Sequence, residues 1–182
     1  MGKVFPDIDE RNAEFIRRQH LFFVASAPLG GDGRVNLSPK GLDCFAILDP
    51  NTVAYLDLTG SGIETVSHLR ENGRITFLFC SFEGPPRLLR LYGRGEVIEP
   101  GDADWPELIG RFPAYRNART IIRTRLDRIA DSCGYGVPQL HYAGERRQLL
   151  DWADRKGEEG IRSYQEDNNA LSIDGLAGLR RP

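Results

Sequence analysis

The amino-acid sequence predicts a mainly β (α+β) fold, in which an antiparallel sheet closes as a barrel or a sandwich and helices lie at its periphery. The first observation is that short apolar segments occur in pairs, each pair joined by a turn rich in Gly, Pro, Asn or Asp. This pattern is typical of β-hairpins in barrels and sandwiches. The second is that stretches with apolar residues at helical spacing interrupt the hairpins and follow them.

The composition is that of an ordinary globular protein. The chain has 182 residues, of which 40% are hydrophobic and 27% charged, and we expect one domain over residues 1–182. A formal net charge of -2 favours neither nucleic acid nor an anionic membrane as a partner. No apolar run approaches the ~20 residues of a membrane helix, and the N-terminus has no apolar signal segment. Three cysteines without metal-binding spacing predict reduced thiols and no metal site in a cytoplasmic protein.

The strands are expected in three hairpins. In chain order these pair residues 21–28 with 34–41, 44–48 with 52–58, and 74–79 with 87–99. The dipeptide Asp32-Gly33 gives the first hairpin a strong turn signal. The segment 120–130 is left open, because its apolar spacing fits a helix whereas its β-branched residues favour a strand.

Helices are expected around these hairpins, over residues 9–19, 61–72, 104–112, 145–156 and 158–166. In the second of them, Ser61 and Glu64 form the S-x-x-E pattern of a capping box, and Gly73 marks the end. Gly157 separates the last two helices. The tail from Asn169 carries spaced apolar residues, so we expect it to pack against the body of the protein.

Two features of the first half of the chain suit an anionic ligand. Residues 34–40 alternate, so that Asn36, Ser38 and Lys40 share one strand face on which every side chain is a hydrogen-bond donor. The alternative is an ordinary solvent-exposed face. The loop 59–62 contains two glycines and precedes a helix, where free backbone N–H groups meet the positive end of the helix dipole. The alternative there is a plain helix cap.

Two arginine-rich stretches follow. In the first, residues 87–94, one strand face carries Arg90, Tyr92 and Arg94, either for an anion or as a solvated face paired with Glu96. The second holds six arginines between residues 111 and 128, which we expect to pair with the acidic C-terminal segment within one chain or across a dimer. Beyond them, two glycines flank an aromatic residue in 132–136, which suggests close backbone approach to a flat group or to another chain.

In this order, the segments RVNLSPKG (34–41), DLTGSG (57–62), GRITFLF (73–79) and RLLRLYGRGEV (87–97) resemble the pyridoxamine 5′-phosphate oxidase-like family, the FMN-binding split barrels. The continuation DSCGYGVP (131–138) and the tail are similar to an oxidase-related branch and extend the resemblance to nearly the whole chain. The resemblance implies an antiparallel split β-barrel over about residues 20–130 with a helical C-terminal extension over about 139–182. It also implies a homodimer with FMN at its interface and oxidoreductase chemistry on a small-molecule substrate.

The resemblance and the polar strand face together imply a set of FMN-binding residues. They are Asn36, Ser38, Lys40, Thr59, Gly60, Ser61, Thr65, Arg87, Arg90, Ser132, Cys133 and Tyr135. The last three are expected near the cofactor of the neighbouring subunit. No catalytic acid or base is predicted.

Departures from the family pattern leave the activity open. Oxidases of the family carry an Arg-Lys pair where this chain has Glu64 and Thr65, and a glutamine where it has Leu88. Their C-terminal Trp and Arg motif for the pyridoxal substrate has no match, so we do not expect oxidation of pyridoxamine phosphate itself. The alternatives are a deazaflavin-binding reductase, a haem-binding split barrel with His68 or His141 as ligand, and a non-catalytic flavin-binding module.

Overall fold

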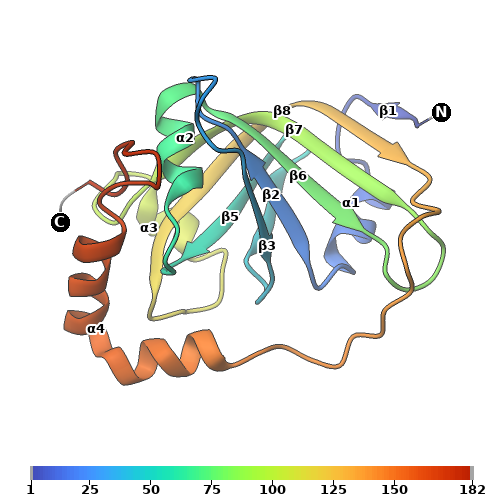
Figure 1. Cartoon of the computed structure of the whole chain (residues 1–182). Coiled ribbons are helices and arrows are strands. Elements are labelled where there is room, and N and C mark those ends of the chain that lie inside the picture. Colours follow the sequence, from blue (N-terminus) through green and yellow to red (C-terminus); the bar gives the residue numbers. More distant parts are fainter. Residues whose placement is uncertain (1, 181–182) are drawn as a thin grey trace.

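A computed structural model describes residues 2–180, which contain eight strands and four helices (Figure 1). The strands are β1 (Val4–Phe5), β2 (Phe22–Ser26), β3 (Asn36–Lys40), β4 (Phe45–Asp49), β5 (Thr52–Leu58), β6 (Arg74–Cys80), β7 (Leu88–Ile98) and β8 (Ala118–Ser132). The helices are α1 (Glu10–Arg17), α2 (Glu64–Asn72), α3 (Trp105–Ile109) and α4 (Gln148–Asn168). The mainly β, α+β class is confirmed.

All strands belong to one antiparallel sheet in the order β3-β2-β6-β7-β8-β5-β4, with β1 added beside β8. The sheet curls into a barrel that stays open, since β3 and β4 are its two edges. The predicted split barrel is therefore confirmed. Each of the three predicted hairpins is present, as β2–β3, β4–β5 and β6–β7.

The segment that the sequence left open is a strand. It forms the centre of β8, the longest strand, which pairs with both β7 and β5. Ile122 lies in the core inside the barrel, whereas Ile121 lies in a second core between the outside of the sheet and α3; both are fully buried. A strand buried on both faces loses its polar alternation, and this is why its pattern also fitted a helix.

The capping-box prediction is wrong. Helix α2 begins at Glu64 with Ile63 as its N-cap residue, and no side chain caps it. Glu64 instead accepts a hydrogen bond from the backbone N–H of Ile173 in the C-terminal tail, over 3.4 Å. The predicted end is right, because Gly73 adopts φ 68°, the left-handed conformation that closes a helix.

The C-terminal extension runs along the open side of the barrel and returns to it (Figure 1). Residues 139–147 form neither helix nor strand, so the first of its predicted helices begins three residues later, at Gln148. As expected, Gly157 breaks α4 into two helical segments, with φ 66° and ψ 178°. The tail packs only in part: Leu179 contacts the barrel core, whereas Leu171 and Ile173 stay 61% and 66% exposed.

No helix within residues 2–180 has the length and apolar character needed to cross a membrane. Residues 1, 181 and 182 lie outside the described part of the chain, and with them the last two residues of the predicted tail.

Candidate functional site

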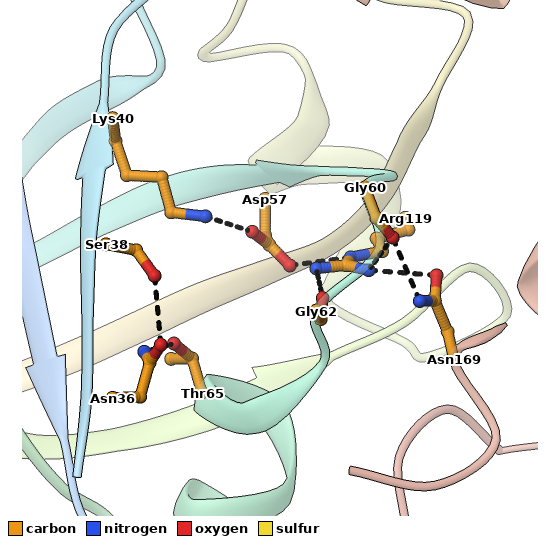
Figure 2. Close-up of polar contacts among 9 residues, drawn as sticks. All are labelled: Asn36, Ser38, Lys40, Asp57, Gly60, Gly62, Thr65, Arg119 and Asn169. Atoms are coloured by element: carbon orange, nitrogen blue, oxygen red, sulfur yellow. Dashed lines mark hydrogen bonds and ion pairs between the residues drawn. The ribbon is translucent and has the colours of Figure 1, made fainter. Parts of the chain in front are cut away.

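Asp57 is the centre of a polar cluster between the edge strand β3, the end of β5 and the start of α2 (Figure 2). Its carboxylate is 1% exposed and accepts from two cations, Lys40 Nζ at 3.1 Å and Arg119 Nε at 2.7 Å. Lys40 is 24% exposed and Arg119 only 4%. Lys40 is therefore the cation of this pair that a ligand can reach. We call this group, with Asn36, Ser38 and Thr65, the Asp57 cluster.

Two opposing effects act on the Asp57 carboxyl. Burial raises its pKa, because desolvation disfavours the charged form. The charges and hydrogen bonds of Arg119 and Lys40 outweigh burial and hold the pKa below its ordinary value. Asp57 is thus ionised at neutral pH, and the cluster of one carboxylate and two cations carries a net positive charge.

This lowered pKa predicts a pH dependence of stability. A carboxyl whose pKa is lower in the folded chain than the ordinary 3.8 contributes its full stabilisation above that value. The contribution is lost as the pH falls through the folded-state pKa. Urea unfolding from pH 6 to pH 2 should therefore show a decline in stability that Asp57→Asn makes shallower. Equal slopes for Asp57→Asn and the wild type would contradict this prediction. Asp102→Asn is the control. A hydrogen bond from Arg180 also lowers the pKa of Asp102, but solvent screens this pair. The Asp102→Asn substitution should therefore change the pH dependence of stability only slightly.

A β-bulge brings Arg119 to the cluster. In β8 it is the extra residue between Ala118 and Thr120, which pair with Leu58 and Asp57 of β5. Its guanidinium also donates to the carbonyl oxygens of Gly60, at 3.3 Å, and Gly62, at 2.6 Å. The sequence showed Arg119 only as one of a run of arginines, and no local signal distinguished it.

The predicted polar face of β3 is present and reaches α2. Ser38 Oγ donates to Asn36 Oδ1 at 3.0 Å, and Asn36 Nδ2 donates to Thr65 Oγ1 at 2.9 Å (Figure 2). The three β3 side chains of this face, those of Asn36, Ser38 and Lys40, are half-buried. The face is therefore neither core nor open surface, which is the setting expected of ligand-binding donors.

The loop before α2 carries backbone donors. Within residues 2–180, the N–H groups of Ser61, Gly62 and Ile63 have no hydrogen-bond acceptor. They lie at the positive end of a helix that no side chain caps. Thr59 differs from the expectation of a ligand hydroxyl: it is fully buried, and its Oγ1 accepts from Gln165 Nε2 at 2.7 Å. Thr59 thus anchors the loop.

A carboxylate leans over this loop. A Cβ atom added to Gly62 would lie 2.5 Å from Glu64 Oε2. Any larger residue at position 62 would have to displace the Glu64 side chain. Glu64 therefore places negative charge close to the amides of the loop, and an anion binding there has to compete with it.

The other predicted site residues form a second group at the ends of β7 and β8. Arg90 Nη1 donates to Ser132 Oγ at 3.1 Å, while Cys133 and Tyr135 are exposed. Arg87 is occupied by neighbours: it donates to Asn12 and Asp131 and lies over the ring of Phe15 at 4.7 Å. Much of this group lines a groove of about 1200 Å³ between α1 and the 81–87 and 133–142 segments.

The two groups lie near opposite ends of β8, with Arg119 at its start and Ser132 at its end. The predicted site residues therefore do not meet in a single subunit. Nor do the histidines join the Asp57 cluster. His68 is buried with Nδ1 3.0 Å from Ser26 Oγ, and burial lowers its pKa. His141 is 97% exposed and lies 3.5 Å from Glu83.

The arginine-rich stretch 111–128 pairs in part as predicted. Arg116 forms ion pairs with Asp154 at 3.5 Å and Glu158 at 3.6 Å, both on α4 of the same chain. Arg123 instead pairs with Glu96 of the neighbouring strand β7 at 2.5 Å and with Asp104, just before α3, at 2.8 Å. The prediction of pairing with the C-terminal segment is confirmed for Arg116.

Comparisons with known proteins agree with the sequence resemblance. The family model for pyridoxamine 5′-phosphate oxidase matches residues 8–133. The pyridoxamine 5′-phosphate oxidase family protein ustO of Aspergillus flavus is 39% identical over 192 residues, which cover 96% of this chain and 77% of that protein.

Among solved structures, HupZ of Group A Streptococcus matches with a TM-score of 0.52 and 21% identity, over 74% of this chain and 99% of that one. A candidate pyridoxamine 5′-phosphate oxidase from Lactobacillus delbrueckii matches with a TM-score of 0.51 and 19% identity, over 70% and 98%. At these identities the two structures support the fold alone.

Proposed function

Because the chain belongs to the pyridoxamine 5′-phosphate oxidase family, we propose that it is an FMN-binding flavoprotein whose Asp57 cluster receives the phosphate of the cofactor. The observation that carries the proposal is a convergence of donors. Lys40 and Ser38 are half-buried on the β3 face whose Asn36 contacts Thr65 in the first turn of α2, and the unpaired amides lie just before that helix. Ammonium, hydroxyl and helix N-terminal amide groups are the donors that bind phosphate in proteins.

The residues present fit a phosphate group that is held by few charges. Arg119 is too buried and too fully engaged to contact it, so Lys40 is the cation in reach. Asp57 shares Lys40, and Glu64 leans over the loop. Neutral donors therefore supply most of the contacts, and we expect selectivity for the phosphate to rest heavily on Lys40.

The second group of residues enters the proposal through a homodimer. In this arrangement, Ser132, Cys133 and Tyr135 of one protomer lie near the cofactor held by the Asp57 cluster of its partner. The exposure of Cys133 and Tyr135 in the single chain supports such a contact. When bound, FMN would supply two-electron redox chemistry toward a small-molecule substrate in the cytoplasm, while the protein binds and orients it.

Lys40→Ala is the direct test. We expect it to weaken FMN binding by about 10- to 100-fold, the value of one charge-assisted hydrogen bond to phosphate. Binding of riboflavin, which lacks the phosphate, should change by less than about twofold on the same grounds. Flavin fluorescence titration measures both. Lys156→Ala, on α4 and away from the cluster, is the matched control and should bind both flavins like the wild type.

Each other outcome has a definite meaning. A wild-type protein that is colourless and takes up no FMN on titration would refute the flavoprotein proposal. A Soret band in the purified protein would favour the haem-binding alternative. If Lys40→Ala lowers FMN and riboflavin affinity equally, then Lys40 does not contact the phosphate.

A further inference from the structure

We propose that Asn169, at the end of α4, is a positioning residue of the cofactor site, and that it acts through Arg119 on the loop 59–63. The inference rests on the proposed FMN site and assigns part of that site to the C-terminal extension. Asn169 lies 50 residues beyond Arg119, and its side chain forms hydrogen bonds with Arg119 and Gly60 and with no residue of β3 within residues 2–180. Its effect on a ligand must therefore be indirect.

The side chain of Asn169 joins Arg119 to the loop. It is fully buried, and its Oδ1 accepts from Arg119 Nη1 at 2.9 Å. Its Nδ2 donates to the carbonyl oxygen of Gly60 at 3.0 Å (Figure 2). The amide thus uses its acceptor and a donor at the same time and bridges Arg119 to the loop.

These contacts orient the loop carbonyls. The Gly60 oxygen accepts from both Asn169 and Arg119, and the Gly62 oxygen accepts from Arg119 Nη2 at 2.6 Å. In a trans peptide the N–H of the next residue points opposite to the C=O, and the chain has no cis peptide bond among the described residues. The N–H groups of Ser61 and Ile63 therefore point away from Arg119.

Amides turned outward in this way suit an anion. Neither N–H has an acceptor within residues 2–180, and both lie just before α2. Successive free N–H groups at a helix N-terminus bind phosphate. Arg119 itself is not the ligand, because its side chain is 4% exposed and donates to four acceptors.

A second contact ties α4 to the same loop. Gln165 Nε2 donates to the buried Thr59 Oγ1 at 2.7 Å, one helical turn before Asn169. Two neutral amides of the C-terminal extension therefore hold consecutive residues, Thr59 and Gly60, at the start of the glycine-containing turn. The extension supplies shape to the site and adds no charge to it.

The test is the phosphate selectivity of Asn169→Ala. We expect its FMN affinity to fall about tenfold, with riboflavin affinity within twofold of the wild type, because only the phosphate contacts depend on the loop amides. Asn168→Ala is the matched control. It removes the same side chain from the neighbouring exposed position, where the amide contacts only the Tyr164 carbonyl, and it should bind both flavins normally.

The outcomes separate this inference from the proposed function. FMN binding by the wild type with unchanged selectivity in Asn169→Ala would overturn the inference and leave the flavoprotein proposal standing. No FMN binding by the wild type would overturn both. If Asn169→Ala does not fold, Gln165→Ala takes its place, since it loosens the same loop at Thr59; unchanged selectivity in that variant would likewise overturn the inference.

Discussion

Replacing Arg119 by methionine is expected to lower the free energy of unfolding by about 3 kcal/mol, the lower end of the range for breaking a buried ion pair. The substitution keeps most of the side-chain volume but leaves the Asp57 carboxylate, 1% exposed, with only Lys40 of its two described cation partners. It also removes the guanidinium hydrogen bonds to the Gly60 and Gly62 carbonyls. Lys40 limits the loss, because it still neutralises part of the Asp57 charge.

Urea denaturation at pH 7 measures this effect. Arg123→Met is the control: Arg123 also forms two ion pairs from β8, but it is 30% exposed, so the loss should stay below about 1 kcal/mol. The double variant Arg119→Met with Asp57→Asn should recover part of the stability, since it no longer buries a carboxylate that is only partly neutralised. A loss below 1 kcal/mol for Arg119→Met would show that the buried pair does not stabilise the barrel.

Phe77→Ala is expected to cost about 3–5 kcal/mol, as buried Phe-to-Ala substitutions do. Phe77 is fully buried inside the barrel, and its ring packs edge-on against Phe45 at 5.4 Å and Tyr55 at 5.9 Å. These contacts join β6 to β4 and β5, on opposite sides of the open barrel. The cavity left by alanine would therefore weaken contact across the split.

Thermal and urea unfolding together test this second prediction. Leu29→Ala serves as the control, because Leu29 is 65% exposed in a turn and its truncation should change stability by less than about 0.5 kcal/mol. Phe77→Leu should recover part of the loss by refilling the cavity with apolar volume. A cost below about 1.5 kcal/mol for Phe77→Ala would mean that the open barrel relaxes to close the gap.

Arg119 connects stability to the proposed binding site, and this determines how variants are interpreted. A change at Arg119 alters both the Asp57 pair and the loop carbonyls. Its effect on FMN binding therefore cannot be assigned to one of the two. Asn169→Ala and Lys40→Ala separate them: the first alters the loop and leaves Lys40 with Asp57, and the second alters the cation and leaves the loop.

Local pattern was sufficient for most of the sheet. The three hairpins follow from alternating apolar residues and turn dipeptides, which act over a few residues and depend little on the rest of the chain. The same alternation placed Asn36, Ser38 and Lys40 on one face. The alternation did not identify β8, because burial on both faces removes the polar signal. The capping-box pattern did not predict the start of α2, because Glu64 contacts the tail at Ile173 instead of capping its own helix.

The centre of the site was beyond the reach of any local pattern. Asp57 lies within an apolar strand segment and Arg119 within a run of arginines, 62 residues apart, and neither stretch shows that the two form a buried pair. Their contact depends on the pairing of β5 with β8 and on the bulge that turns Arg119 inward. Asn169 joins them only because α4 returns to the barrel. Pairing between distant segments depends on how the whole chain packs, and so the tertiary structure alone decides it.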